Sequence, residues 1–296
     1  MSIKKIIITT GMYLDKELRL LVSFDEKDKA LDLINLDVTK VGTVCEATVE
    51  KVLNDIDACI LKLSTGDKGF IENKKLKPEF FKVRHSEKKT VCQEDKFWVE
   101  ITQDRKNTKP YSCKFLSEHT GERDFIDYYV AEMAGDDFEV ISDLPELLQR
   151  DFKVRLYEDD SYSLWDLYGL TALLDRTLSK VVHLKSGGNL IIEPTEAMTI
   201  IDVNSSKNYG KTCAFDTNME AVEELARQLR LRSISGIVIV DLLKVSKEEQ
   251  KEIIDTFKKA CKEDFSQVTV HGFTNLGLLE ITRSRITAPI NSLFNE

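Results

Sequence analysis

Two short runs of apolar residues stand near the start of the chain. Residues 6–8 and 18–24 are mostly aliphatic, and the polar breaks around them read DKE and DEKDK. Apolar runs bounded by charged turns are typical of β-strands. The pattern therefore predicts a β-hairpin at the edge of a sheet.

Residues 41–108 contain several short β-branched runs that follow one another closely. The runs are GTVCEATVEKVL, DACILKL, KGFIEN and FWVEITQ, and polar turns separate them. Short strands at this spacing predict a small all-β barrel.

The next two segments differ in charge and in periodicity. Residues 120–160 are acidic, as in AGDDFEV and YEDDS, which predicts a solvated connecting segment. Residues 161–178 place leucines three and four positions apart, and this spacing predicts a single helix.

The last third of the chain has the most regular pattern, in which strand-like and helical segments alternate. The strand-like runs are residues 197–203, 236–243, 268–271 and 278–281. Capping boxes predict that one helix starts at Thr217, with Glu220 three positions on, and that another starts at Ser246. The first of these helices extends over 217–232. The order predicts an α/β layer, and the unbroken apolar strands predict burial on both faces.

Composition sets limits on this picture. The chain has 296 residues, of which 42% are hydrophobic and 31% charged, enough for one large core or two to three modest ones. Its 42 Lys and Arg against 51 Asp and Glu give a net charge of −9, which predicts no general attraction to nucleic acid. Such binding would need a local patch, and residues 71–90, rich in Lys and interleaved with aromatic rings, form one.

The cysteines and the start of the chain bear on metal content and compartment. The six cysteines are scattered without a CxxC pair, which predicts reduced thiols and no structural zinc. No apolar run reaches the roughly 18 residues of a membrane span, and the start lacks the pattern of a secretory signal. We expect a cytoplasmic protein without a membrane partner.

Candidate chemistry centres on Asp202 and Asp241, each of which ends an apolar strand. Ligands of α/β folds bind at the carboxyl ends of strands, so the two carboxylates converge if their strands are neighbours. Two hard oxygen donors without His or Cys beside them suit Mg²⁺, which can lower the pKa of an attacking water. The alternative is that each Asp is an ordinary turn residue or helix cap.

Polar residues near this pair have open interpretations. Asn204 points to the same side of an extended strand as Asp202 and can donate to a phosphate oxygen, although the pattern alone favours a turn role. Arg230, near a helix end, either complements the helix dipole or reaches a phosphate. Glu280 either faces the same cleft or pairs with Arg283 or Arg285.

The barrel segment offers a second kind of candidate. Phe70 is either a platform on which a base stacks or a residue of the barrel core, and Lys109 is a candidate phosphate contact. The sequence contains no GxxxxGK[ST], HExxH or GxSxG motif, which argues against NTPase, zinc protease and serine hydrolase functions.

Three segments carry a resemblance to a known family. VVHLKSGGNLIIEPTEAMTIIDVNSSK, FDTNMEAVEELARQLRLRSISGIVIVDLL and LGLLEITRSRI resemble the catalytic core of the ribonuclease E/G family over residues 181–286. The resemblance implies an α/β (α+β multidomain) fold. Its parts are an RNase-H-like subdomain at 1–38 plus 110–178, an inserted S1 (OB-fold) barrel at 39–109, and a DNase-I-like catalytic subdomain at 179–296.

The resemblance also implies residue roles. Asp202 and Asp241 fall on the family's ligands of a catalytic Mg²⁺, for which Mn²⁺ is an expected substitute. Asn204 falls on the Asn that helps hold the metal site and the scissile phosphate. The expected RNA contacts are Phe70 as a base-stacking aromatic, Lys109, Lys207 and Arg230.

The chain also departs from the family pattern. Ile60 stands where the family has a second stacking aromatic, and Asn275 stands where it has an Arg before GLLE. The short acidic segment before the core lacks the Arg and Thr of a 5′-monophosphate sensor. The sequence stops before the cysteines of the family's zinc link, so any oligomer is not expected to use that link.

Two hypotheses follow from the sequence. The first is a Mg²⁺-dependent endoribonuclease that cleaves single-stranded RNA, an rRNA precursor or mRNA, in the bacterial cytoplasm and leaves 5′-phosphate and 3′-hydroxyl ends. The second is a non-catalytic RNA-binding protein on the same fold, disabled by the changes at Ile60 and Asn275. They differ in whether the protein cleaves RNA in an EDTA-sensitive way, and a purely structural role would require negligible RNA affinity.

Overall fold

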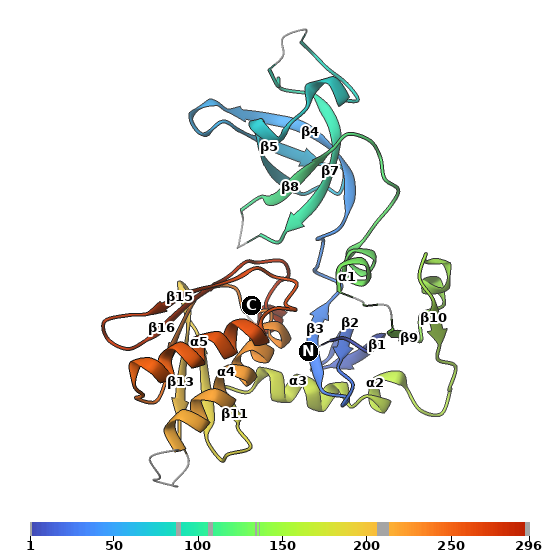
Figure 1. Cartoon of the computed structure of the whole chain (residues 1–296). Helices are drawn as coiled ribbons and strands as arrows, with labels where there is room; N and C mark the ends of the chain where they lie inside the picture. Colours follow the sequence, from blue (N-terminus) through green and yellow to red (C-terminus); the bar gives the residue numbers. More distant parts are fainter. Residues whose placement is uncertain are drawn as a thin grey trace. The chain divides into compact units, whose positions relative to one another are not determined.

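Figure 1 presents the protein as a computed structural model, which describes residues 2–86, 90–105, 109–133, 135, 137–205 and 213–293. The chain divides into two units. The two-sheet unit comprises Met1–Asp37, Met133–Arg285 and Pro289–Glu296, and the barrel unit comprises Val38–Glu132 and Ile286–Ala288. The barrel unit is therefore an insertion in the sequence of the two-sheet unit.

The N-terminal apolar runs form the middle of a five-stranded sheet. Its strands are β1 (Lys5–Tyr13), β2 (Lys16–Phe24), β3 (Ala30–Asn35), β9 (Glu139–Ser142) and β10 (Val154–Leu156), in the order β10-β9-β1-β2-β3. β1 and β2 form the predicted antiparallel hairpin. The prediction that this hairpin lies at a sheet edge is wrong, because β9 flanks β1 and β3 flanks β2.

The acidic segment 120–160 is structured, contrary to the prediction of a solvated connection. It supplies α1 (Phe125–Met133) as well as β9 and β10. Its apolar side chains Tyr129, Val140, Ile141 and Leu147 are buried. The frequent acidic residues hide these widely spaced apolar positions from a reading based on average charge.

Two helices replace the single helix predicted over 161–178. α2 (Leu164–Leu167) ends at Tyr168, and α3 (Leu170–Leu178) starts after Gly169, whose φ of +58° lies in the left-handed region. An L-residue adopts that conformation at a cost, so glycine suits the break. Trp165 of α2 packs on β1, where a Cβ at Gly11 would come within 2.2 Å of the indole. Leu164 of α2 and the leucines of α3 otherwise cover the first sheet.

Five strands close into a barrel, as predicted. They are β4 (Val44–Leu53), β5 (Ala58–Leu63), β6 (Lys68–Glu72), β7 (Lys96–Gln103) and β8 (Tyr111–Leu116), in the order β4-β5-β6-β8-β7. Alternate side chains such as Leu61, Phe97 and Val99 fill the interior. The barrel extends beyond the predicted boundary at residue 109, because β8 completes the closure.

A six-stranded sheet forms the rest of the two-sheet unit. Its strands are β11 (Val181–His183), β12 (Asn189–Pro194), β13 (Met198–Asn204), β14 (Gly236–Asp241), β15 (Val268–Phe273) and β16 (Leu279–Arg283). The order is β11-β12-β13-β14-β16-β15. β13 and β14 are parallel, whereas the other neighbours in this sheet are antiparallel.

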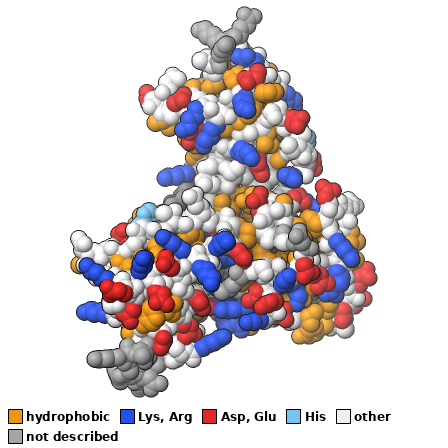
Figure 2. All heavy atoms as spheres, viewed as in Figure 1, with side chains coloured by type: hydrophobic (Ala, Val, Ile, Leu, Met, Phe, Trp, Pro, Cys, Tyr) orange, Lys and Arg blue, Asp and Glu red, His pale blue; other side chains and the backbone are white. Residues whose placement is uncertain are grey.

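Two helices cover one face of this sheet, α4 (Cys213–Leu231) and α5 (Lys247–Ala260). Val203 and Val240 are buried against them, whereas Ile200 and Ile237 on the opposite face are 40% and 46% exposed. The prediction of strands buried on both faces is therefore wrong. Figure 2 shows charged side chains of both signs over α4 and α5. We call the uncovered side the open face.

The predicted starts of the two helices have different outcomes. Ser246 and Glu249 form the predicted capping box of α5. Thr217 is not a cap, because α4 is already helical at Cys213 and Thr217 is buried within it. Glu220, its predicted partner, instead accepts hydrogen bonds from the backbone N–H groups of Lys185 and Ser186 at 2.5 and 3.0 Å.

The remaining described features are short helices and cysteines. The 3₁₀ helices are η1 (Asn54–Ile56), η2 (Asn73–Lys75), η3 (Pro78–Phe80), η4 (Pro145–Gln149) and η5 (Ile290–Leu293). The described thiols at positions 45, 59, 92, 113 and 261 are free, as predicted, and burial raises the pKa of Cys113 to about 12. Across the described ranges, every helix is too short or too polar to cross a membrane.

Candidate active site

The carboxyl ends of β13 and β14 bring two carboxylates together. The strands are parallel neighbours, and Asp202 is the register partner of Asp241. Neighbouring strands lie about 4.8 Å apart. Both side chains lie on the open face, because the alternate residues Ile201 and Val240 point into the core. The structure thus meets the condition on which the sequence argument for a metal site depended.

Asn204 controls the direction of one of these carboxylates. Its Nδ2 donates to Asp202 Oδ2 at 2.8 Å and approaches Asn189 Oδ1 of β12 at 3.5 Å. Nearby, a Cβ at Gly188 would come within 2.6 Å of the Asn204 carbonyl oxygen, so glycine permits this close approach. Sequence reasoning missed Asn189, whose role depends on its pairing with Asn204 across two strands.

Two further polar positions lie along the same sheet. Glu280 of β16 is exposed opposite Ile239, which places it on the open face. It is not the partner of Arg283, whose guanidinium binds Asp264 in a buried ion pair at 2.8 Å. The first of the two alternatives for Glu280, a position facing the carboxylates, is therefore the one that its strand position supports.

The turn between β15 and β16 borders the carboxylate edge. Leu279 at the start of β16 is opposite Val240, so the preceding turn lies beside the end of β14 that carries Asp241. Asn275 is exposed in this turn. The turn is held by the Thr274 N–H donating to Leu278 O at 2.9 Å. The missing Arg of the family motif thus belongs to the border of the site.

The donor set fits a hard divalent cation. Asp202 and Asp241 offer carboxylate oxygens, and the amide of Asn204 orients one of them. Within the residues that the structure describes, no group of three or more His, Cys, Asp or Glu side chains could hold a metal ion. Mg²⁺ typically takes one or two carboxylates and keeps waters for substrate phosphate, so two protein ligands suffice.

Phe70 lies on the outside of the barrel. Its strand neighbours Gly69 and Ile71 are buried, whereas Phe70 is half-buried. It lies opposite Ile60 of β5 and beside Ser112 of β8. The core alternative for Phe70 is therefore excluded. Lys109 is exposed two residues before β8. Because Ser112 of β8 is the register partner of Phe70, Lys109 lies close to Phe70 along the chain entering this strand.

Arg230 has a place that the sequence did not predict. It is 3% exposed, and its Nε and Nη2 donate to the two oxygens of Asp32 at 2.9 and 2.6 Å. Ser23 Oγ donates to the same carboxylate at 2.7 Å. The prediction of an RNA contact by Arg230 does not fit a guanidinium enclosed in this way. A sequence signal for this ion pair was available in ALDLIN, where Asp32 stands in an otherwise apolar strand and needs a buried partner.

Lys207, the fourth predicted RNA contact, lies outside the described residues.

These observations define the class of protein. It combines a closed S1-like barrel, which carries a half-buried aromatic on its outer wall, with a mixed α/β sheet whose parallel strands end in paired carboxylates.

The chain belongs to the ribonuclease E/G family. The sequence profile described as "Ribonuclease E/G family" matches residues 84–286. Ribonuclease G of Salmonella typhimurium is 39% identical over 127 residues, 41% of this chain and 26% of that protein. Ribonuclease G of Haemophilus influenzae is 39% identical over 147 residues, 48% of this chain and 29% of the relative. Ribonuclease E of Buchnera aphidicola is 31% identical over 216 residues, which are 66% of this chain and 22% of that protein. The chain thus spans about a quarter of the length of these relatives.

Proposed function

We propose that this chain is a Mg²⁺-dependent endoribonuclease that cleaves single-stranded RNA, an rRNA precursor or mRNA, in RNA processing or decay. The observation that carries the proposal is the pairing of Asp202 with Asp241 on the open face, with Asn204 bonded to one of them. The relatives named Ribonuclease G and Ribonuclease E support RNA as the substrate. With RNA as substrate, the bacterial cytoplasm is the proposed place of action.

The proposed mechanism divides the work among three side chains. Asp202 and Asp241 would hold the ion, with Mn²⁺ as a substitute for Mg²⁺, and Asn204 keeps the Asp202 carboxylate turned toward the site. When bound, a divalent ion lowers the pKa of an attacking water and neutralises charge on the phosphate. Because both carboxylates lie on the open face, the RNA backbone would approach them from the solvent side. We propose 5′-phosphate and 3′-hydroxyl products.

The barrel would supply strand binding. Phe70 offers an outward aromatic face for a base, and Lys109 offers a phosphate contact. We infer that the barrel is the S1 domain, that the first sheet with α2 and α3 corresponds to an RNase-H-like subdomain, and that the second sheet corresponds to a DNase-I-like subdomain.

The test replaces each carboxylate by an isosteric amide. Asp202→Asn and Asp241→Asn proteins are expected to bind a short unstructured RNA like wild type but to lose cleavage in Mg²⁺. Asp255→Asn is the matched control, because it makes the same charge change on α5, which covers the opposite face of the sheet. EDTA should abolish wild-type cleavage, and undiminished cutting by either active-site variant would contradict the proposal.

The same experiment decides the alternative of a non-catalytic RNA-binding protein. That alternative is favoured by Asn275, an amide where the family resemblance leads us to expect a guanidinium, and by Ile60, an aliphatic residue opposite Phe70. It predicts salt-sensitive RNA binding with no Mg²⁺-dependent products.

A further inference from the structure

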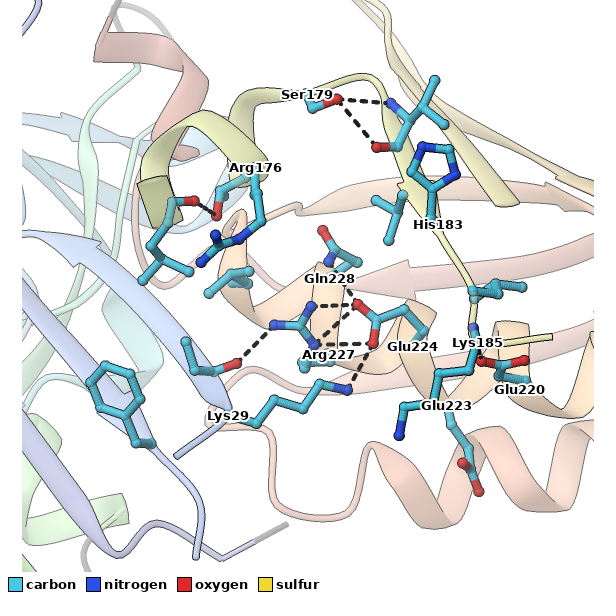
Figure 3. Close-up of a pocket in the computed structure, with 18 of the residues that line it drawn as sticks. Lys29, Arg176, Ser179, His183, Lys185, Glu220, Glu223, Glu224, Arg227 and Gln228 are labelled. Carbon is cyan, nitrogen blue, oxygen red and sulfur yellow. Dashed lines mark hydrogen bonds and ion pairs between the residues drawn. The ribbon is translucent and has the colours of Figure 1, made fainter. Parts of the chain in front are cut away.

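A pocket of about 860 Å³ lies beside β11, the edge strand of the six-stranded sheet (Figure 3). It is enclosed by α3, by α4 and by the turn that joins β2 to β3, all within the two-sheet unit. Phe24, Leu173 and Leu231 form apolar parts of its wall. Pockets of roughly 300–1,000 Å³ with mixed walls are the usual size of small-molecule sites.

An internal network occupies the centre of this pocket (Figure 3). The Glu224 carboxylate accepts hydrogen bonds from Arg227 at 3.0 Å, from Lys29 at 2.9 Å and from Gln228 at 2.8 Å. Burial works to raise the pKa of Glu224, but the hydrogen bonds and charges of Arg227, Gln228 and Lys29 outweigh it and hold the pKa at about 2. Glu224 is thus ionised and already saturated with donors.

The remaining free groups of the lining are mainly donors. The side chains of Arg176 and His183 are exposed and make no hydrogen bond or ion pair with the described residues, and Figure 3 shows both at the upper part of the pocket. Of the other lining carboxylates, Asp28 is bound by Lys5 and Glu220 by backbone N–H groups, whereas Glu223 is exposed. A guanidinium and an imidazole beside an apolar wall suit a phosphate group with an attached base.

A row of polar side chains connects the pocket to the carboxylate pair. His183 of β11 is opposite Asn189 of β12, and Asn189 is opposite Asn204 of β13. Residues opposite one another in antiparallel strands share a face, so all three lie on the open face. Two strand spacings, about 10 Å, separate His183 from Asn204. The pocket and α4 lie on the other side of this sheet, so a strand held at Asp202 would reach the pocket round the edge strand β11, where His183 lies.

We propose that the pocket is a second RNA-binding site, which takes a nucleotide of the strand whose scissile phosphate lies at Asp202 and Asp241. The inference rests on the proposed function for the identity of the ligand. Arg176 binds the phosphate of that nucleotide, His183 lies on the path to it, and the apolar wall receives the base. The site sets how much single-stranded RNA the protein must contact on one side of the cut.

The test uses Arg176→Ala and fluorescence anisotropy with a labelled single-stranded RNA in EDTA, so that no cleavage occurs. A hydrogen bond to a charged group contributes at least about 1.5 kcal/mol, so the variant should bind about tenfold more weakly. Loss of one phosphate contact should also lower the slope of log K against log salt by about 0.7. Arg155→Ala is the matched control, because it removes an exposed guanidinium of the same unit outside the pocket. Equal thermal unfolding midpoints would confirm that the variants are folded.

Two outcomes separate this inference from the proposed function. With Mg²⁺, Arg176→Ala should raise KM for a long RNA and leave kcat unchanged, and it should not affect a dinucleotide, which is too short to reach the pocket. If wild type binds RNA through Arg176 but never cleaves it, the proposed function fails and the binding site stands. If Arg176→Ala binds and cleaves long RNA like Arg155→Ala, the second site is overturned.

Discussion

At Asp202 a single hydrogen bond sets the direction of a carboxylate. Asn204 Nδ2 is 2.8 Å from Oδ2, and within the described part of the chain no backbone N–H donates to this carboxylate. Removing the amide would let the carboxylate turn toward water. Groups that orient a metal ligand typically affect metal affinity or activity by about 10- to 100-fold.

Asn204→Ala is accordingly expected to lower cleavage by about 10- to 100-fold at limiting Mg²⁺, while RNA binding in EDTA stays unchanged. Titrating Mg²⁺ in the cleavage assay is the measurement, and a higher Mg²⁺ requirement is the expected signature. Asn54→Ala, in η1 of the barrel, is a control that removes an exposed amide elsewhere. An unchanged Mg²⁺ requirement in Asn204→Ala would contradict the orienting role.

The position of a residue could be predicted where a strand end determines it, but not where a partner distant in sequence does. Asp202 and Asp241 follow apolar runs, and their meeting needed only that two strands be neighbours. In the sequence Arg230 looks like any cation at a helix end, but in the structure it forms a buried ion pair with Asp32, which lies far away in the chain. No local pattern on α4 contains that information.

At the scale of elements, α4 is bound to the first sheet by buried charge. Arg230 pairs with Asp32 of β3, and Arg227 Nη1 donates to Ala30 O of the same strand at 2.9 Å while its Nε binds Glu224. Such pairs cost free energy to desolvate, and losing one partner is strongly destabilising. The helix is therefore fixed to β3 by specific partners in addition to apolar packing.

Glu224 makes this attachment dependent on pH. Its folded pKa, about 2, lies below the ordinary 4.5, so its contribution is present above about pH 4.5 and is lost as the pH falls toward 2. At pH 7, Glu224→Gln should lower the free energy of unfolding by up to about 3 kcal/mol. The difference from wild type should shrink between pH 5 and 2, measured by denaturant unfolding.

The control for this prediction is Glu223→Gln, the exposed neighbour on the same helix. It is expected to leave stability nearly unchanged over the same pH range, since exposed charges contribute little. A pH-independent difference between Glu224→Gln and wild type would show that the carboxylate charge does not hold the network.

Element boundaries were predictable where an end signal is local. The capping box of Ser246 marks α5 correctly, whereas the Thr217 and Glu220 spacing is coincidental because Glu220 faces the turn after β11. Likewise, the leucine spacing of 161–178 continues across Gly169, where the backbone breaks. Periodicity reports which side chains can share a face, but it does not report whether the backbone stays helical.

At the scale of the whole molecule, the proposed base-stacking surface and the proposed catalytic site lie in different units. The barrel unit carries Phe70 on its outer wall, and the two-sheet unit carries the carboxylates. Composition does not reveal this division, because the net charge of −9 averages over both units. The change from short β runs to alternating strands and helices does reveal it. β8 was missed because the polar segment before it resembles the end of a domain.

The pairing of Ile60 with Phe70 gives a gain-of-function prediction for the barrel. Ile60→Phe would place a second ring on the neighbouring strand β5, directly opposite Phe70. Stacking on one base contributes about 1–3 kcal/mol, so single-stranded RNA binding should tighten by about tenfold, whereas Phe70→Ala should weaken it by a similar factor. Fluorescence anisotropy in EDTA measures both.

Tyr162→Ala, which removes a half-exposed aromatic from the two-sheet unit, serves as the control for general loss of an aromatic surface. It should bind RNA like wild type. If Phe70→Ala and Tyr162→Ala behave alike, the outer wall of the barrel is not where bases stack.

The open face has a consequence for how this gene can change. Side chains on β14 alternate between water and the helices, so deleting any one residue from 236–240 would turn Asp241 inward while sending its apolar neighbour outward. Loss of a single codon there, with the reading frame kept, would thus bury the carboxylate of Asp241 and expose an apolar side chain. Loss of two codons would restore the alternation and only shorten the strand, so length variants of this segment should survive in even numbers.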